Sequence, residues 1–402
     1  MRRSSESSSQ ASPPRILLYS HDSFGIGHLS RSLTIARTLV DSLPGASAVI
    51  ATGSPCATRF PAREGIDVVK LPSISKDGTG RYVARSLPLG LDAVIAMRRR
   101  LLLELYRAYR PHLLVVDHKV TGLAGELLPV LRAARSNGTR TILGLRDIID
   151  DPCSVASEWR HAEVQRSFTE DFDRICIYGW PTVFDPRIEY ALPDGVAERV
   201  EFTGYVVRPR GARPWKALPG PRPRVVVTVG GGEDGAQRLE TYLAGLELGQ
   251  AEWDTTLVSG PLLEPREARR IERRARQIGH VEVRPFHSEL PRVLQGASAV
   301  VSMAGYNTAA EILSSHVPAV LLPRVWPRAE QLIRAERLQR RGLAQCLRSP
   351  TPRTLRDTVE RALVAEPVRG ERPPLDGTAA ITRIASELLD LEVPVREEAC
   401  VQ

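Results

Sequence analysis

A histidine follows two closely spaced glycines near the N-terminus, in the segment HDSFGIGHLSRS. Gly25 and Gly27 allow a tight turn whose backbone can approach a ligand, and His28 stands where the next helix is expected to begin. An imidazole, with a pKa of about 6.5, is the usual general base at neutral pH. The competing interpretation is a simple turn in which the histidine caps the helix. Ser30 occupies the place of the third glycine of a dinucleotide fingerprint, which disfavours a nicotinamide-dependent oxidoreductase.

A glycine triplet opens the second half of the chain, in the segment VTVGGGEDGAQ. Gly230, Gly231 and Gly232 are expected to present backbone N–H groups at a helix N-terminus, where the helix dipole also favours phosphate oxygens. No G-K-[ST] follows, which excludes a P-loop nucleotidase. Glu233 and Asp234 would repel an anion, so we expect them to face solvent or the N-terminal domain. A plain interdomain turn is the alternative.

A third segment, ASAVVSMAGYNTAAEILSS, combines a strand end, small residues and a helix start. Asn307 or Thr308 can cap this helix, while Glu311, about one turn further, is placed to accept hydrogen bonds from a ribose diol. The alternative is a capped helix in which Glu311 interacts only with the positive end of the helix. The predicted donor-binding residues here are Ser302, Ala304, Gly305, Asn307, Thr308 and Glu311.

A fourth segment, PRVWPRAEQLIRA, follows another strand. Glu330 and Gln331 begin a helix and can present a carboxylate and an amide to sugar hydroxyls. Arg324 is suited to stabilise a leaving nucleotide. The competing interpretation is surface charge pairing with Arg328 or Arg334.

Acidic residues end two further predicted strands. Asp117 and His118 close the strand LLVVDHK and can line the acceptor side or orient the histidine of the first loop. Asp147, Asp150 and Asp151 in RDIIDDP suggest a metal cluster, because hard cations prefer carboxylates. The segment ends in Asp-Pro, as many loops and helix caps do, so we favour a structural role and predict no bound metal.

Apolar, β-branched runs alternate with helical patterns throughout, which indicates parallel sheets covered by helices. We expect two Rossmann-like, doubly wound α/β domains facing each other across a cleft. In such sheets ligands bind beyond the carboxyl ends of the strands, where the four segments above lie. The expected strands are residues 15–20, 48–51, 67–71, 113–117, 141–145 and 174–178 in the first half, and 225–229, 256–258, 281–284, 299–302 and 319–322 in the second.

Changes in composition divide the chain into five parts. Proline, glycine and arginine break every period between the two halves, which predicts a linker. The last helix, expected over residues 378–391, is placed so that it could pack on the N-terminal domain. The parts are a disordered leader 1–14, an acceptor-side domain 15–205, a linker 206–223, a nucleotide-sugar domain 224–375 and a C-terminal helix and tail 376–402.

The composition, with 42% hydrophobic and 25% charged residues among 402, is that of a globular protein. The net charge of +8 is spread along the chain, which argues against nucleic acid but favours small anionic ligands. Five scattered cysteines, no C-x-x-C and no secretory signal predict a reduced, cytoplasmic protein. No stretch reaches the roughly 18 apolar residues of a membrane span. Arginines 98–100 beside leucines 101–103 would suit a membrane surface and a lipid acceptor, although a helix with one solvated face is the commoner meaning.

Three motifs occur in order along the chain: G-x-G-H-x-x-R, S-x-A-G-x-N-T-x-x-E and P-R-x-x-x-x-x-E-Q. With them the chain resembles the family of the peptidoglycan N-acetylglucosaminyl transferase, a GT-B glycosyltransferase family, and particularly its branch of predicted glycosyltransferases. The resemblance covers residues 15–347. It implies that His28 lies in the interdomain cleft, that Glu311 holds the nucleotide ribose, and that Glu330 and Gln331 touch the donor sugar.

Further expectations come from this resemblance alone. Phe286 lies in a loop similar to the nucleobase-binding loop of the family, and Gly25, Gly27 and Arg31 belong to its acceptor-side loop. Two features depart from the family pattern: Glu330 stands where the family often has glutamine, and the GGGEDG loop lacks the usual serine. The departure at Glu330 leaves the donor sugar open, and phosphate contacts in the second loop must come from the backbone.

We therefore expect an inverting, metal-independent glycosyltransferase without a cofactor, because displacement from the opposite face inverts the anomeric carbon and fixed N–H dipoles with Arg324 can stabilise the leaving nucleotide. Such an enzyme would move a sugar from a nucleotide-diphosphate sugar, such as a UDP-sugar, to a small-molecule acceptor of natural-product metabolism, with His28 as general base. A nucleotide-sugar 2-epimerase on the same fold and a non-catalytic partner of another transferase are the alternatives. An epimerase needs no acceptor, whereas an accessory protein would neither transfer nor hydrolyse a donor.

Overall fold

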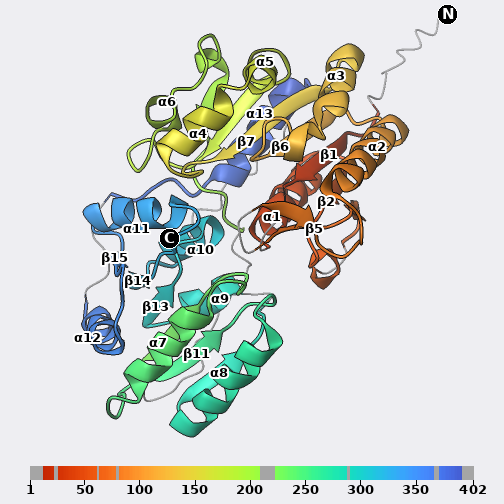
Figure 1. Cartoon of the computed structure of the whole chain (residues 1–402). Helices are drawn as coiled ribbons and strands as arrows, with labels where there is room; N and C mark the ends of the chain where they lie inside the picture. Colours follow the sequence, from red (N-terminus) through yellow and green to blue (C-terminus); the bar gives the residue numbers. More distant parts are fainter. Residues whose placement is uncertain are drawn as a thin grey trace, which may run out of the picture.

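The chain forms two domains, each a parallel sheet flanked by helices (Figure 1). The computed structural model describes residues 12–21, 26–60, 63–77, 81–208, 222–287, 290–365 and 371–391. Gly25, most of the predicted leader, residues 209–221 of the predicted linker and the end of the chain lie outside the described residues. The predicted α/β class with two doubly wound domains is confirmed.

The strands of the first sheet are parallel, and in the described residues their order is β3-β2-β1-β6-β7-β8-β9. They are apolar almost throughout because a sheet covered on both faces is buried on both. A short antiparallel hairpin, β4 (Ile74–Lys76) with β5 (Tyr82–Ala84), was not predicted. The sheet strands are β1 (Arg15–Ser20), β2 (Ser47–Thr52), β3 (Ile66–Lys70), β6 (Leu113–Asp117), β7 (Arg140–Arg146), β8 (Arg174–Tyr178) and β9 (Val200–Phe202).

The helices of this domain follow the predicted pattern with one break. The helical segment between β6 and β7 is divided, because Ala124 and Gly125 have positive φ values of 48° and 73°. A 3-10 turn covers Leu123–Gly125. The α-helices are α1 (Gly27–Ser42), α2 (Leu91–Tyr109), α3 (Leu128–Asn137), α4 (Pro152–Trp159), α5 (Ala162–Glu170) and α6 (Pro186–Glu189).

Helix α2 carries the basic segment considered for a membrane surface. Arg98 is buried, and its Nε and Nη2 each donate a 2.6 Å hydrogen bond to the carboxylate of buried Glu126. Breaking such a buried pair typically costs about 3–5 kcal/mol. Arg99 and Arg100 are exposed, and Leu102 is buried. The segment therefore has one buried side, whereas Arg99, Arg100 and Leu101 are exposed.

The second sheet is also parallel, with the order β12-β11-β10-β13-β14-β15 in the described residues. Its strands are β10 (Arg224–Thr228), β11 (Asp254–Val258), β12 (Val281–Arg284), β13 (Ala299–Ser302), β14 (Ala319–Leu321) and β15 (Gln345–Cys346). Its helices are α7 (Ala236–Leu246), α8 (Pro265–Ile278), α9 (Leu290–Gln295), α10 (Tyr306–Ser315), α11 (Glu330–Arg340) and α12 (Pro352–Leu363). Figure 1 shows α10 and α11 on the side of this domain that faces the first domain.

Strand β1 lies between β2 and β6, and β10 lies between β11 and β13. In each sheet the strand order therefore reverses beside the first strand of the domain. Such a switch point opens a crevice at the carboxyl ends of the strands, where α/β proteins bind their ligands. The histidine loop and the glycine triplet follow these two strands, so the topology directs both toward ligand-binding positions.

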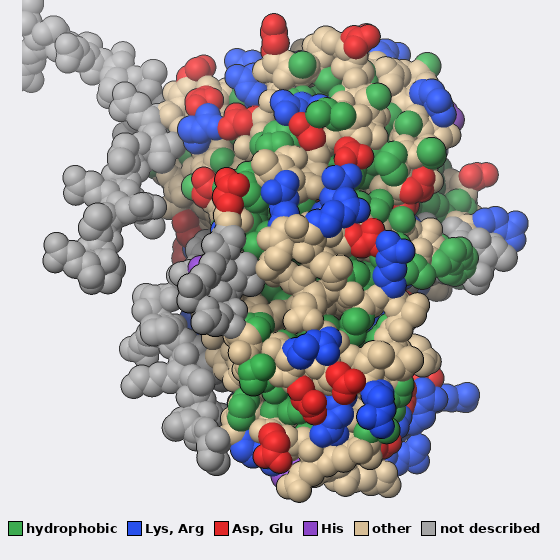
Figure 2. Space-filling model, turned by 90° about the vertical axis from the view of Figure 1, so that its left-hand side faces the viewer, with side chains coloured by type: hydrophobic (Ala, Val, Ile, Leu, Met, Phe, Trp, Pro, Cys, Tyr) green, Lys and Arg blue, Asp and Glu red, His purple; other side chains and the backbone are tan. Residues whose placement is uncertain are grey.

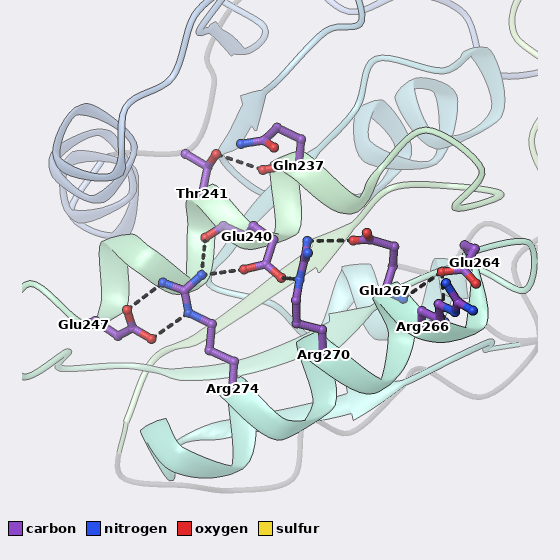
Figure 3. Close-up of polar contacts among 9 residues, drawn as sticks. All are labelled: Gln237, Glu240, Thr241, Glu247, Glu264, Arg266, Glu267, Arg270 and Arg274. Carbon is purple, nitrogen blue, oxygen red and sulfur yellow. Dashed lines mark hydrogen bonds and ion pairs between the residues drawn. The ribbon is translucent and has the colours of Figure 1, made fainter. Parts of the chain in front are cut away.

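Helix α8 packs on α7 at the end of the C-terminal domain that lies away from the first domain (Figure 1). Arg270 and Arg274 of α8 both pair with Glu240 of α7, and Arg274 also pairs with Glu247 (Figure 3). Glu264 caps α8 by accepting hydrogen bonds from two backbone N–H groups of its first turn. Partly exposed ion pairs of this kind are typically worth about 0–1 kcal/mol each, so they orient the helix rather than hold it.

The last helix, α13 (Gly377–Leu388), returns to the N-terminal domain and packs on α1 and β8 (Figure 1). The N–H of Gly377 donates to the carbonyl of Tyr205 at 3.2 Å. A Cβ at Gly377 would lie 2.8 Å from that carbonyl, so the close approach requires glycine. The chain thus crosses between the domains twice.

Figure 2 shows basic and acidic side chains interspersed over both domains on the face that it presents. The excess positive charge forms no single patch on that face. In the described part of the chain, no helix is both long and apolar enough to cross a membrane.

Candidate active site

A cavity of about 540 Å³ lies between the two domains. Its walls come from the loops after β1 and β7 on one side and from those after β10, β13 and β14 on the other. The predicted site residues that line it are Gly27, His28, Arg31, Gly230, Gly231, Gly232, Phe286, Gly305, Asn307, Thr308, Glu311, Arg324, Glu330 and Gln331. The predicted residues that do not line it are Asp117, His118, Ser302 and Ala304, all of which are buried.

On the N-terminal side, Asp117 holds the two polar side chains of the first loop. The Nδ1 of His28 lies 2.5 Å from one carboxylate oxygen of Asp117. Arg31 donates to the other oxygen from Nε at 2.9 Å and from Nη2 at 2.6 Å. His28 and Arg31 are one turn apart at the start of α1, and Asp117 is the last residue of the neighbouring strand β6. Asp117 thus positions His28 without lining the cavity itself.

The protonation state of His28 follows from this arrangement. Burial lowers the pKa of His28 to about 4, although the Asp117 carboxylate opposes the shift. The pKa of Asp117 is itself lowered, because the Arg31 and His28 contacts outweigh its burial. A carboxylate only accepts hydrogen bonds, so Nδ1 carries the proton of the neutral imidazole. Nε2 therefore holds the free lone pair, which is the form that a general base requires.

Two more histidines surround His28. The ring of His21 lies 5.7 Å from that of His28 and lines the cavity, whereas the ring of His118 lies 5.0 Å away behind it. Burial lowers the pKa of His21 and of His118 well below the usual value. His118 has a left-handed φ of 71°, and neither of its ring nitrogens has a hydrogen-bond partner in the described structure. Both rings are neutral at pH 7, so they surround His28 without adding charge.

The glycine triplet differs from the predicted cradle of free amides. The Gly230 N–H points to the Thr228 hydroxyl at 3.4 Å, and the Gly232 N–H donates to the Val229 carbonyl at 3.4 Å. Of the three N–H groups, only that of Gly231 has no hydrogen-bond partner among the described residues. Glycine is required at Gly232 for another reason, because its φ is 94° and a Cβ there would lie 2.5 Å from the Ser259 carbonyl. The prediction that the triplet presents free backbone N–H groups is therefore wrong for Gly230 and Gly232, and it fits Gly231.

The start of α10 also differs from the prediction. Its N-cap residue is Gly305 in an extended conformation, and no side chain caps the helix. The Asn307 amide instead donates to the Gly27 carbonyl of the first domain at 2.8 Å. The predicted cap by Asn307 or Thr308 is therefore wrong, because the domain contact takes the Asn307 side chain. The uncapped first turn leaves backbone N–H groups facing the cavity, where an anion is favoured.

Glu311, one turn into α10, lines the cavity and is 8% exposed. Burial raises its pKa, and Arg208, which donates to its carboxylate at 3.1 Å, opposes the shift. Arg208 follows β9 in the chain connection between the domains, so this ion pair joins the connection to the C-terminal domain.

Arg324 is not free in this structure. It donates to Asp234 from Nη1 at 2.8 Å and to Glu330 from Nη2 at 2.6 Å, and its backbone N–H donates to the Gln331 side chain at 3.0 Å. The two carboxylates neutralise the guanidinium that was expected to stabilise a leaving nucleotide. One carboxylate oxygen of Glu330 is buried without a hydrogen-bond partner and is therefore able to accept a hydrogen bond from a ligand. Glu233 faces the N-terminal domain as expected and pairs with Arg85.

Two of the three aspartates of RDIIDDP contact the C-terminal domain, and the third caps a helix of its own domain. Asp147 accepts from Arg334 of α11 at 3.0 Å, and both side chains are completely buried. Asp150 accepts from the Ala329 N–H at 2.9 Å, and Asp151 caps α4. No group of three or more potential metal ligands occurs in the parts of the chain that the structure describes. The structural interpretation of these aspartates fits the contacts.

Several cavity residues were not singled out from the sequence, among them a histidine and two arginines. His21 follows β1, Arg146 ends β7, and Arg208 lies in the connection between the domains. The rule that ligands bind at the carboxyl ends of parallel strands, applied to every predicted strand, would have selected His21 and Arg146. Nothing local distinguishes Arg208, because it stands in an arginine-rich and proline-rich stretch.

Residues 225–367 match the glycosyltransferase family 28 C-terminal domain. The UDP-N-acetylglucosamine–N-acetylmuramyl-(pentapeptide) pyrophosphoryl-undecaprenol N-acetylglucosamine transferase of Halorhodospira halophila is 30% identical over 226 residues, which are 50% of this chain and 60% of that protein. The enzyme of the same name from Shouchella clausii is 35% identical over 78 residues, 18% of this chain and 22% of that protein. The matches span less than two-thirds of either relative.

Solved structures of glycosyltransferases share the two-domain fold over almost the whole chain. The glycotransferase of kitacinnamycin has a TM-score of 0.61 at 19% identity and covers 96% of this chain and 100% of its own. MurG of Acinetobacter baumannii has a TM-score of 0.57 at 15% identity, covering 93% and 100%. The chain therefore has the GT-B fold and resembles the family of the peptidoglycan N-acetylglucosaminyl transferase, and its residues 225–367 match the glycosyltransferase family 28 C-terminal domain.

Proposed function

We propose that the chain transfers a sugar from a nucleotide-diphosphate sugar to an acceptor with inversion at the anomeric carbon. The observation that carries this proposal is the pairing of His28 with Asp117 in one wall of a cavity whose other wall is the family 28 domain. The first wall supplies a neutral imidazole. The opposite wall supplies an uncapped helix N-terminus and a buried carboxylate.

The donor binds the C-terminal domain in this proposal. Its diphosphate lies against the first turn of α10 and the Gly231 N–H, and its ribose bonds to Glu311. Glu330 and Gln331 are left for the sugar hydroxyls, because the unpartnered oxygen of Glu330 is an acceptor. Phe286 lines the same cavity, 6.4 Å from the ring of Phe60 in the first domain, and is placed beside the nucleobase.

The reaction is a direct displacement. The acceptor oxygen forms a bond to the anomeric carbon while the bond from that carbon to the diphosphate oxygen breaks. The acceptor proton moves to Nε2 of His28, and the imidazolium that results is stabilised by Asp117. The diphosphate leaves with the electron pair, and the amide dipoles of α10 and Gly231 stabilise its charge. These fixed dipoles do the work of a metal ion, so we propose metal-independent transfer.

The acceptor is proposed to be a small molecule, since two structural neighbours are named for kitacinnamycin and calicheamicin. The curated relatives are named for an undecaprenol-linked acceptor. Leu87 and Leu89, before α2, and Met97 and Leu101, on it, are exposed and would suit a lipid. Transfer that requires detergent or vesicles would favour the lipid, and transfer in plain buffer the small molecule.

The first experiment is a thermal-shift panel of UDP, GDP, TDP and their sugars on the full chain, because bound ligand raises the melting temperature. We expect one nucleotide to stabilise the protein.

Incubation of the stabilising donor with no acceptor, with and without EDTA, then tests the alternatives. An epimerised sugar nucleotide would contradict transfer and favour the 2-epimerase. Absence of both transfer and donor hydrolysis across acceptor panels would favour a non-catalytic partner, and loss of transfer in EDTA would contradict metal independence.

A further inference from the structure

Arg146 ends β7 and lines the cavity from the N-terminal domain. The residue is 9% exposed, and its Nε is buried without a hydrogen-bond partner. Within the described residues its guanidinium makes no hydrogen bond and no ion pair. A buried cation without a partner is costly, so such a side chain is expected to serve a ligand.

The other arginines of the crevice are all paired with carboxylates. Arg31 binds Asp117, Arg208 binds Glu311, Arg324 binds Asp234 and Glu330, Arg328 lies 3.7 Å from Asp150, and Arg334 binds Asp147. Each of these charges is neutralised within the protein. Arg146 alone, in the part of the chain that the structure describes, brings to the cavity wall a guanidinium that forms no ion pair.

The charge of Arg146 interacts with both His28 and Glu330. Its charge contributes to the lowered pKa of His28. Burial lowers the pKa of Arg146 itself to about 10, with the Glu330 carboxylate opposing the shift and the Arg31 guanidinium adding to it. Arg146 therefore stays charged at pH 7, close enough to His28 and to Glu330 to interact with both.

We propose that Arg146 binds an oxyanion, a carboxylate or a phosphate, that the substrate carries next to the point of sugar transfer, and that the acceptor is therefore acidic. This inference rests on the proposed function. The diphosphate is assigned to the other domain, at α10, whereas Arg146 belongs to the domain of His28, where the acceptor lies. A guanidinium can bind such a group through two parallel hydrogen bonds, which also orients it.

A stability comparison separates a ligand-binding arginine from a structural one. We compare the melting temperatures of the ligand-free full chain, Arg146→Met and the matched control Arg334→Met. Arg146→Met is expected to melt no lower than the wild type, because it removes an unpaired buried charge. Arg334→Met is expected to lose stability, because it leaves Asp147 buried and unpaired. A marked fall for Arg146→Met would overturn the inference.

A binding experiment tests the oxyanion directly. The full chain is saturated with UDP, and inorganic phosphate is titrated while the melting temperature is followed. Phosphate stabilises folded proteins in general, but this general effect is the same in the wild type and in Arg146→Met. We expect apparent phosphate binding about 10- to 100-fold weaker in Arg146→Met, since hydrogen bonds to charged groups contribute on that scale. Equal responses of the two proteins would overturn the inference.

Two comparisons identify the source of the oxyanion. If the oxyanion belongs to the acceptor, the wild type binds UDP-glucose and UDP-glucuronate with similar affinity. A preference for UDP-glucuronate that depends on Arg146 would show that the oxyanion belongs to the donor sugar. This result would overturn the inference of an acidic acceptor. Weaker binding of UDP itself to Arg146→Met would assign the diphosphate to Arg146, which also overturns the inference. If no nucleotide stabilises the wild type while the Arg146-dependent phosphate response persists, the proposed function fails and the anion site stands.

Discussion

The loops after β1 and β10 occupy the same topological position in their two sheets, yet they contribute different chemistry to the cavity. The first loop acts through side chains: His28 and Arg31 are both held by Asp117 at the end of the adjacent strand. The second acts through its backbone, since Gly231 and Gly232 form a turn packed directly against the chain at Gly260. The comparison teaches that one crevice can combine a titratable group from one domain with fixed dipoles from the other.

The largest expected effect comes from removing the titratable group. His28→Ala should lower turnover by about 10² to 10⁴, the usual contribution of a general base, while donor affinity stays unchanged. Asp117 keeps its contacts with Arg31 in this variant, so the fold is expected to survive. Steady-state kinetics with donor titration measures both quantities. Unchanged turnover would show that the first loop does not act through the His28 side chain.

A matched pair of glycine substitutions tests whether the loop after β10 acts through its backbone. Gly232→Ala and Gly230→Ala both place alanine at a positive φ, but only the Cβ at Gly232 meets other backbone atoms. We expect Gly232→Ala to weaken UDP binding about 10- to 100-fold, from roughly 1–3 kcal/mol of strain, and Gly230→Ala to weaken it less. Isothermal titration measures the affinities. Equal losses in the two variants would mean that the turn geometry is not what supports the nucleotide.

Glu311 is the side chain of the C-terminal wall that is proposed to bind the ribose of the nucleotide. Glu311→Gln should weaken UDP binding by about tenfold, because a charge-assisted hydrogen bond to the ribose becomes a neutral one. The 2′,3′-dideoxy nucleotide lacks the hydroxyls and should bind both proteins alike. A tenfold loss for the dideoxy nucleotide as well would contradict the contact between Glu311 and the ribose.

The smallest expected effect is in the pH profile. Because the pKa of His28 is lowered to about 4, the neutral base remains dominant as the pH falls from 7.5 to 5.5. We expect kcat/KM to change by less than about twofold over this range and to fall as the pH drops through about 4. A base with the ordinary pKa of about 6.5 would lose about tenfold over the same range. Such a loss would mean that burial does not control His28.

Much of this arrangement could be read from local sequence. Apolar runs followed by glycine loops placed β1 and β10 and the loops after them, because the period of a buried strand and the punctuation by glycine are local properties. Asp117 was proposed to orient the histidine on the basis of its place at a strand end alone. Positions on the same edge of a parallel sheet can be predicted in this way.

Partners distant in the sequence could not be read in this way. Asn307 was a reasonable helix cap, but its amide bonds to Gly27 across the domain boundary. Arg324 was a reasonable phosphate ligand, but Asp234 and Glu330 neutralise it. The capping preference of Asn307, worth about 1 kcal/mol, lost to a contact that only the packing of the two domains creates. Arg324 is neutralised by contacts that the folding of the C-terminal domain creates.

The sequence by itself determined the two sheets, the loops at their switch points and the side chains that these loops carry. Those properties depend on hydrophobic period and on backbone freedom, which neighbouring residues set. Only the tertiary structure decided which charges are paired and which remain open. That outcome depends on distances between residues far apart in the chain, and it left Arg31 and Arg324 neutralised while Arg146 faces the cavity without a partner among the described residues.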